Sequence, residues 1–406
     1  MRSHADQPQT RAEPLPLADP EPWPASGPQP ADAGASAFEQ AGGFTVGLEE
    51  ELLLLDPQTL LPAPSVESAL VTVEDDGRFL RELKQSQLEI STPPAQTVAE
   101  ASRELGDARG RLVERLDGAF RLVAVGTHPL STELGGISAG RRYRALLDEY
   151  QWVARASGAC GLHVHVAVGG AARSLAVFNA VRSYVPELAA LAANSPFVGG
   201  DDSGLVSVRQ LGETFPRTGM PPCFASWEAL AAYLRWGRRG GLFPDGTHFW
   251  WDLRPHLRHG TLELRVPDAQ TRISDVAAIA ALFACLAAEL AARFDAGERL
   301  ATDPTYRIAE NSWRALRYGV GGWMVDLATG EPIPARERLA STIDRLETVA
   351  EQLRCTDELH HARTLLAGTG ADRQRYVAEH EGLDGLLRHL VAETEAPARS
   401  RAQSSK

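Results

Sequence analysis

The sequence predicts an α+β protein in which the strands form an antiparallel or mixed sheet. Two observations support this class. Strand-like segments with alternating side chains occur in loose pairs through the first two thirds of the chain, and helix-like segments separate them. After Ser274 the pattern is almost entirely helical.

The first predicted elements are a strand and a long helix. Residues 44–55, FTVGLEEELLLL, read as a strand, although three adjacent glutamates interrupt its apolar run. Residues 97–116 are predicted as a helix, because Thr97 and Glu100 form a capping box and apolar residues recur at helical spacing. Further strands are expected in residues 82–91, 120–126, 161–168, 248–255 and 260–266, and further helices in residues 141–156 and 174–193.

The chain is expected to hold one folded domain between two loose ends. Residues 1–40 contain eight prolines among Ala, Asp, Gln and Gly, a composition that indicates a disordered arm. Residues 394–406 look like a second disordered tail. No proline- or serine-rich linker and no repeat occurs in between, so residues 41–393 are predicted to form a single catalytic domain.

Composition narrows the class of protein. Among the 406 residues, 44% are hydrophobic and 23% are charged, which suits a globular protein with an ample core. The net charge of −12 argues against a nucleic-acid partner. Four scattered cysteines without a CxxC pair indicate a reduced, cytoplasmic protein. No run approaches ~18 consecutive apolar residues, so no membrane span is expected. The sequence leaves open whether the protein forms a homo-oligomer.

Polar residues alternate with aliphatic ones inside four of the predicted strands. Side chains at positions i and i+2 share one face of a strand and lie ~6.6 Å apart. Glu49 and Glu51 therefore share a face, and Glu50 points the other way. The other same-face sets are Gln85, Gln87 and Glu89, then His163 with His165, then Glu263 with Arg265.

These faces have two interpretations. For any single strand, a polar face exposed to water is the simpler explanation. However, such a face usually carries Lys, Thr and Ser, whereas these strands carry mainly Glu, His, Gln and Arg. Carboxylates with one imidazole, gathered on a concave face, suit Mg²⁺ or Mn²⁺ better than a soft metal. The candidate ligands are Glu49, Glu51, Glu89, His163 and Glu263.

Seven motifs in a fixed order carry a resemblance to a known family. They are VGLEEELLLLDP, ELKQSQLEISTPP, GTHP, CGLHVHVAV, ANSPF, TLELRVPDAQT and ENSWRALRYG. Together they resemble the carboxylate–amine ligases of the glutamate–cysteine ligase type 2 family, clearly over residues 44–319 and more loosely beyond. The resemblance implies a fold like the catalytic domain of glutamine synthetase, a curved and mostly antiparallel sheet with helices on its outer face.

The resemblance also implies an activity and roles for the site residues. The activity is ATP-dependent coupling of L-glutamate to an amine, typically L-cysteine, with Mg²⁺ and with Mn²⁺ as a possible substitute. The reaction would pass through γ-glutamyl phosphate and release ADP and phosphate. Arg265 resembles the arginine beside the transferred phosphate. Gln85 stands where a further carboxylate might be expected, which leaves Glu82 as the candidate for the sixth ligand. The residues that resemble metal ligands are Glu49, Glu51, Glu89, His163 and Glu263.

Several alternatives stay open. Arg314 and Arg317, at i and i+3 on one helix face, are candidate phosphate-binding residues for the nucleotide, but they also suit a solvated face. Arg265 could form only a structural salt bridge. The His163–His165 pair on a strand also begins some metal-dependent hydrolase sites. A non-catalytic binder on the same fold is the remaining rival.

Overall fold

The computed structural model describes residues 33–73, 77–212 and 214–396. Its centre is a seven-stranded sheet in the order β10-β11-β5-β1-β3-β2, and β4 pairs with β1 beside this path. All of the pairs in this sheet are antiparallel. The strands are β1 (Thr45–Leu55), β2 (Phe79–Arg81), β3 (Gln87–Ser91), β4 (Arg121–Val123), β5 (Leu162–Ala167), β10 (Leu253–His256) and β11 (Thr261–Leu264).

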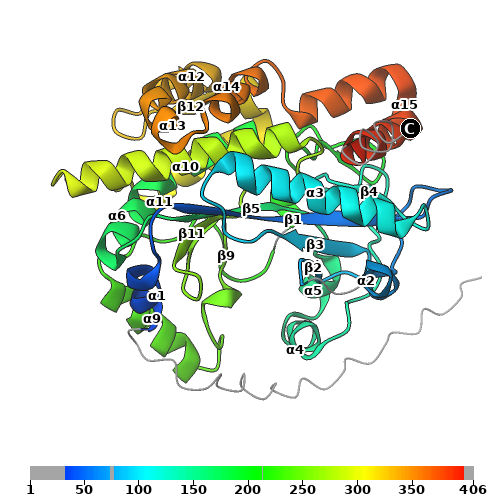
Figure 1. Cartoon of the computed structure of the whole chain (residues 1–406), viewed down its shortest axis with the longest axis horizontal. Coiled ribbons are helices and arrows are strands. Elements are labelled where there is room, and N and C mark those ends of the chain that lie inside the picture. Colours follow the sequence, from blue (N-terminus) through cyan, green and yellow to red (C-terminus); the bar gives the residue numbers. More distant parts are fainter. Residues whose placement is uncertain (1–32, 74–76, 213, 397–406) are drawn as a thin grey trace, which may run out of the picture.

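Helices cover one face of this sheet. Figure 1 shows α3 (Val98–Leu116) and α10 (Ile273–Asp295) side by side above β1 and β5. The strands turn aliphatic side chains such as Leu48, Val164 and Leu262 toward this layer, where all three are buried. Burial of this apolar face is the main driving force for docking helices on a sheet. The side chain of Thr97 accepts the backbone N–H of Glu100, as the capping prediction requires.

The helix α10 is long and apolar enough to cross a membrane, judged by length and composition alone. However, 78% of its most apolar window is buried inside the protein, and core helices of soluble proteins pass the same test. One such helix is therefore weak evidence for a membrane span.

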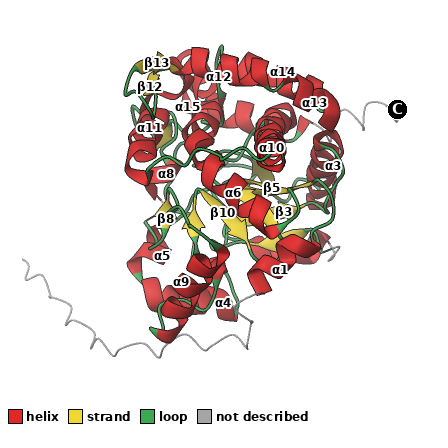
Figure 2. Cartoon of the chain, turned by 90° about the vertical axis from the view of Figure 1, so that its left-hand side faces the viewer, coloured by secondary structure: helices red, strands yellow, loops and turns green. Residues whose placement is uncertain are grey.

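The later part of the chain is helical, as predicted, with one small hairpin. Figure 2 shows these helices stacked beyond α10. The elements are α11 (Thr305–Tyr318), β12 (Trp323–Val325), β13 (Pro332–Pro334), α12 (Ala335–Arg345), α13 (Glu347–Leu353), α14 (Thr356–Leu365) and α15 (Gly370–Thr394).

Shorter elements complete the fold around the sheet and the helical layer. The helix predicted over residues 141–156 is two helices, because Gln151 has a positive φ of 45° that interrupts it. The helix predicted over residues 174–193 is also divided, by a 3₁₀ turn. The elements outside the main sheet and the C-terminal helices are α2 (Val66–Val73), α4 (Arg141–Tyr150), α5 (Trp152–Ala156), α6 (Ala171–Val181), α7 (Val185–Leu191), β6 (Phe197–Val198), β7 (Asp201–Asp202), α8 (Arg209–Gly212), β8 (Thr218–Gly219), α9 (Trp227–Arg239) and β9 (Trp250–Trp251).

The predicted disordered ends need correction at both boundaries. Residues 33–40, assigned to the arm, form the helix α1 (Ala33–Gln40). Its Phe38 is buried against Trp227, with ring centroids 4.8 Å apart. The helix is therefore anchored, because one large aromatic side chain buries enough apolar surface to hold a short helix in place. Glu395, assigned to the tail, is buried and paired with Arg121. Residues 1–32 and 397–406 lie outside the described residues.

Candidate active site

The register of the sheet brings the predicted site residues together on the face opposite α3 and α10. Glu49 lies directly across from His163, and Glu51 across from Glu89. Glu263 lies across from His165 on one side and from Arg254 on the other. Paired residues in an antiparallel sheet have side chains on the same face, so the five strands β1, β3, β5, β10 and β11 contribute to one cluster.

Glu49 joins the two histidines at the centre of this cluster. Its carboxylate oxygens lie 3.2 Å from Nδ1 of His163 and 3.5 Å from Nε2 of His165. The Oε1 atom of Glu263 is 4.0 Å from each histidine ring. Two carboxylates and two imidazoles thus surround one small volume.

A second group of carboxylates lies on the β3 side. Glu51, Glu82 and Glu89 place one oxygen each within 4.8 Å of the others. Glu51 also accepts the backbone N–H of Gly161 at 2.6 Å. A side chain at Gly161 would collide with Arg209, so a close approach of the backbone accounts for this glycine.

The donor set fits a hard divalent cation. Besides the trio just described, two further trios have ligand atoms within 4.8 Å of one another: Glu49, His165 and Glu263, and Glu49, Glu89 and His163. The Nε2 atoms of both histidines are buried and have no hydrogen-bond partner among the described residues. Buried nitrogens without partners are costly unless a ligand satisfies them. Carboxylate oxygens with imidazole suit Mg²⁺ or Mn²⁺.

The carboxylates of the site fall into two groups, those with a raised pKa and those with a lowered pKa. Burial, reinforced by the charge of Glu82, raises the pKa of Glu51 to about 8. Burial and the charge of Glu49 likewise raise the pKa of Glu89 well above its usual value. A bound cation would offset both effects by stabilising the charged carboxylates.

Glu49 and Glu263 behave in the opposite way. Burial alone would raise the pKa of Glu49, but the neighbouring His163 and His165 outweigh it and hold the pKa well below the usual value. For Glu263 the charges of Arg254 and Arg265 outweigh burial and lower the pKa well below its usual value. These two carboxylates are held charged by neighbours that the fold fixes in place.

Arg265 reaches the cluster, as predicted. Its Nη1 donates to Oε1 of Glu263 at 2.6 Å and lies 3.4 Å from Nδ1 of His163. Arg254, which the sequence did not single out, donates two hydrogen bonds to the same carboxylate of Glu263. The signal that could have revealed Arg254 is its i to i+2 spacing from His256 on the strand before TLELRV.

His165 and the turn between β10 and β11 also belong to the site. His165 shares its face with His163, as the alternation predicted, but it was considered only for a hydrolase. The rings of His256 and His259 stack at 4.2 Å, and the ring of His256 lies 5.4 Å from that of His165.

The two candidates for a sixth ligand, Glu82 and Gln85, lie in different places. Glu82 joins Glu51 and Glu89, whereas the side chain of Gln85 accepts the N–H of Gly136 outside the cluster. Residues 82–86 form a turn before β3, so the predicted alternation does not extend to Gln85. Glu82 is therefore the better candidate for the additional ligand.

Arg314 and Arg317 do not reach the cluster. Arg314 donates to the carbonyl oxygen of Trp323 and stacks on its ring, and Arg317 donates to the carbonyl oxygen of Gly204. Neither arginine lines the cavity that contains the carboxylates. The prediction that they bind the nucleotide is not supported, because α11 packs among the helices and not against the open face of the sheet.

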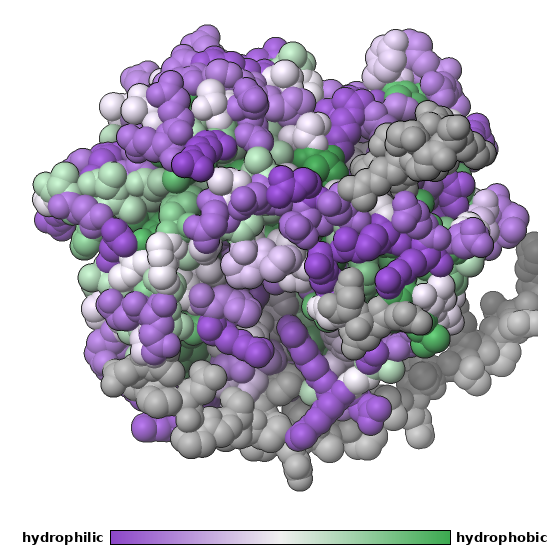
Figure 3. All heavy atoms as spheres, in the orientation of Figure 1, coloured by the Kyte–Doolittle hydropathy of each residue, from purple (hydrophilic) through white to green (hydrophobic). Residues whose placement is uncertain are grey.

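A cavity of about 300 Å³ opens onto the cluster. Figure 3 shows a mostly hydrophilic face of the molecule that is hollowed near its middle. One side of the cavity is lined by α4 and the other by the β10–β11 turn. Arg142 and Tyr143 from α4 and Arg258 from the turn are among the lining residues.

Comparison with solved structures defines the fold. A bifunctional glutathione synthetase from Pasteurella multocida matches 90% of this chain and 54% of its own, with a TM-score of 0.63 and 15% identity. A glutamate–cysteine ligase from Francisella tularensis, solved in complex with AMP, matches 89% of this chain and 94% of its own, with a TM-score of 0.61 and 13% identity. The fold is that of the glutamine-synthetase-like ligases, as the motifs implied.

Comparison of sequences defines the family. The sequence model described as "Glutamate-cysteine ligase family 2(GCS2)" matches residues 45–393. A protein of Rubrobacter xylanophilus named "Putative glutamate--cysteine ligase 2-3" is 41% identical over 361 residues, which cover 86% of this chain and 97% of that protein. The chain belongs to glutamate–cysteine ligase family 2, and it is a carboxylate–amine ligase of that type. The hydrolase alternative loses its support.

Proposed function

We propose that this protein uses ATP and Mg²⁺ to join the side-chain carboxylate of L-glutamate to an amine, with L-cysteine as the first candidate acceptor. The observation that carries the proposal is the set of three carboxylate and carboxylate–imidazole trios on one sheet face beside Arg265. The names and likenesses of the relatives add support for the substrates, because the Francisella enzyme is a glutamate–cysteine ligase solved with AMP.

The reaction explains why such a cluster is needed. A carboxylate does not acylate an amine directly, because its leaving group would be oxide. Transfer of the terminal phosphoryl group of ATP gives γ-glutamyl phosphate, whose leaving group is phosphate. Attack by the amine nitrogen then forms the amide, and the amine loses a proton. The products are the amide, ADP and phosphate.

The residues of the chain have separate tasks in this scheme. Phosphoryl transfer needs positioning and neutralisation of charge more than covalent help. Glu49, Glu51, Glu82, Glu89, His163, His165 and Glu263 would hold the magnesium ions. Magnesium supplies positive charge to the phosphate oxygens. Arg265 presents a planar, permanently charged donor to the transferring phosphoryl group, and its bond to Glu263 fixes its direction.

A trapping experiment tests the first half of the reaction. With L-glutamate, ATP and Mg²⁺ present, hydroxylamine should capture the acyl phosphate as a hydroxamate, and ADP should appear in equal amount. Omission of glutamate should leave only background. A signal that is the same with every carboxylic acid would contradict a glutamate site, and the absence of ADP with any amino acid would contradict the ligase proposal. A screen of amines for added ADP release then identifies the acceptor.

A further inference from the structure

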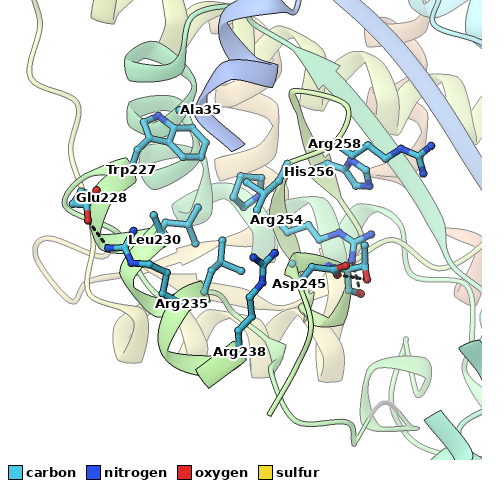
Figure 4. A pocket seen from close by; sticks show the side chains of 16 residues that line it. Ala35, Trp227, Glu228, Leu230, Arg235, Arg238, Asp245, Arg254, His256 and Arg258 are labelled. Atoms are coloured by element: carbon cyan, nitrogen blue, oxygen red, sulfur yellow. Dashed lines mark hydrogen bonds and ion pairs between the residues drawn. The ribbon is translucent and has the colours of Figure 1, made fainter. Parts of the chain in front are cut away.

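A second and larger cavity adjoins the active-site cavity. It has a volume of about 510 Å³ and lies between α9 and the β10–β11 turn (Figure 4). The two cavities share four lining residues, Thr247, Arg254, His256 and Arg258. An occupant of the second cavity would therefore cover part of the way into the first.

The second cavity has an apolar wall. Leu230, Leu234 and Leu257 contribute aliphatic surface, and Trp227 contributes a ring. Figure 4 shows Trp227 and Leu230 on the α9 side, opposite the strand that carries His256. Cavities of roughly 300–1,000 Å³ enclose a group the size of one drug-like molecule. This cavity therefore suits a short segment of chain with one large apolar side chain.

Two cations beside this wall have no carboxylate partner. Figure 4 shows Arg238 extending from α9 into the space between the walls. Its Nε donates to the carbonyl oxygen of Pro244, and among the described residues no salt bridge joins a carboxylate to Arg238 or Arg258. Asp245 is held by hydrogen bonds from Thr247. In a protein with a net charge of −12, this locally positive lining favours an occupant with carboxylates.

The helix α1 contacts both walls of the cavity. Phe38 packs on Trp227 of α9, and a Cβ atom at Gly260 in the β10–β11 turn would lie only 2.3 Å from the carbonyl oxygen of Ala37. Ala35 lines the cavity itself, as Figure 4 shows. Because α1 begins at Ala33, the chain that precedes it joins the helix two residues from a lining residue.

The sequence of the preceding arm complements this lining. Residues 12–32, AEPLPLADPEPWPASGPQPAD, contain four carboxylates and neither Lys nor Arg. Their one aromatic residue, Trp23, stands between two prolines. Proline-rich segments bind aromatic-lined grooves at a low cost in entropy, because they already favour one extended conformation. An acidic segment with one large ring thus fits a cavity that has cations beside an apolar wall.

The arm is long enough to reach the whole cavity. Trp23 precedes Ala33 by ten residues. An extended proline-rich chain advances ~3.1 Å per residue, so Trp23 reaches positions up to ~31 Å from the start of α1. The tether also gives the segment an effective concentration at the cavity on the order of millimolar, so weak contacts suffice for docking.

We propose that residues 19–25, DPEPWPA, dock in the cavity between α9 and the β10–β11 turn. Trp23 packs against the apolar wall, and the carboxylates of the segment pair with Arg238 and Arg258. The docked segment covers the residues that the two cavities share and so restricts entry to the carboxylate cluster. The docking is independent of the proposed ligase function, and only its effect on turnover rests on that function.

Photo-crosslinking in the full chain tests the docking. A benzophenone amino acid in place of Trp23 should crosslink to α9 or to the β10–β11 turn of the same chain, as mapped by mass spectrometry. The same probe in place of His4 should give at least about tenfold less of these products, because only the docked segment stays at the wall. Crosslinks to another surface, or equal yields from both positions, would overturn the docking. Crosslinks between isotopically light and heavy chains would place the arm on a second copy and overturn the intramolecular contact.

A charge exchange tests the proposed ion pairs. Arg238→Glu should lower the crosslink yield by about tenfold, because it sets a like charge beside the acidic segment. Arg239→Glu should leave the yield unchanged, because this exposed neighbour does not line the cavity. Adding Glu21→Arg to Arg238→Glu should restore the yield, since the two charges then attract. Equal yields from the two arginine variants, or no recovery in the double variant, would overturn the pairing.

The effect on turnover is measured separately. Trp23→Ser should lower the KM values for ATP and L-glutamate by up to about tenfold at unchanged kcat, because a segment docked nine tenths of the time raises an apparent Kd by about that factor. Unchanged KM values would overturn the restriction of entry. If the chain has no ligase turnover at all, the proposed function fails, while the crosslinks still decide the docking.

Discussion

Glu50 and Glu51 are neighbours on β1, but they face opposite sides of the sheet. Glu50 is completely buried under α3 and forms a salt bridge with Arg109, which also donates to the backbone of Thr271. Glu51 lies on the cavity side among Glu82 and Glu89. The same residue type thus meets a fixed positive partner on one side and further negative groups on the other.

This difference separates a structural carboxylate from a functional one. Behind the sheet, burial raises the pKa of Glu50, but the salt bridge to Arg109 opposes this effect, so no added cation is needed there. In the cavity, burial and like charges raise the pKa of Glu51 to about 8, and only an added cation would make the ionised cluster favourable. Substitutions test this difference, because a change at Glu51 should lower activity and a change at Glu50 should lower stability.

The largest effect is expected for Glu51→Gln. A bound metal contributes several kcal/mol to phosphoryl transfer, and each 1.4 kcal/mol is about a factor of ten. Loss of a ligand should therefore lower Mg²⁺-dependent ADP formation by more than about 10³-fold. The melting temperature should be unchanged or higher, because a neutral amide relieves repulsion from Glu82 and Glu89. Normal turnover in this variant would refute the metal assignment.

Glu50→Ala should produce the reverse pattern. It leaves the guanidinium of Arg109 buried without its carboxylate, which typically costs about 3–5 kcal/mol of folding free energy. Urea denaturation should show this loss, while the folded fraction keeps its Mg²⁺-dependent turnover. The double variant Glu50→Leu with Arg109→Met should recover much of the stability, because it removes both charges. A single variant that is inactive but fully stable would mean that Glu50 acts in the site.

Arg265→Lys tests the boundary between these two roles. Arg265 donates to Glu263, but Arg254 binds the same carboxylate, so Glu263 stays paired after the substitution. The melting temperature should therefore change little. An ammonium cannot match two phosphate oxygens as a guanidinium can, so kcat should fall by ~10²–10³-fold at nearly constant affinity for ATP. A near-normal kcat in steady-state kinetics would mean that the role of Arg265 is structural, through its bond to Glu263.

Strand periodicity was enough to predict most of the cavity face. Alternation alone placed Glu49 with Glu51, His163 with His165, and Glu50 on the other side, because the side-chain period of a strand is fixed. The register between strands could not be predicted this way. The pairing of β1 with β5 brings Glu49 to His163, and the pairing of β11 with β10 brings Arg254 to Glu263.

The predictions that failed concern residues outside the strands, where the two-residue alternation of a strand does not apply. Gln85 was assigned to a strand face, but it lies in a turn whose geometry depends on contacts with Gly136. Phe38 was assigned to a disordered arm, because composition averages over a segment and overlooks one anchoring ring. For helices, i and i+3 spacing shows which residues share a face but not which partner that face meets.

Arg314→Ala should have the smallest effect and sharpens the contrast with Arg265. Arg314 stacks on the exposed ring of Trp323 and donates to its backbone oxygen, contacts that contribute about 0.5–1 kcal/mol at a surface. We expect a small decrease in melting temperature and a KM for ATP within about twofold of the wild type. A tenfold rise in that KM would show that the nucleotide reaches α11. The same measurement thus distinguishes the two candidate nucleotide sites, one on the helical layer and one beside the open face of the sheet.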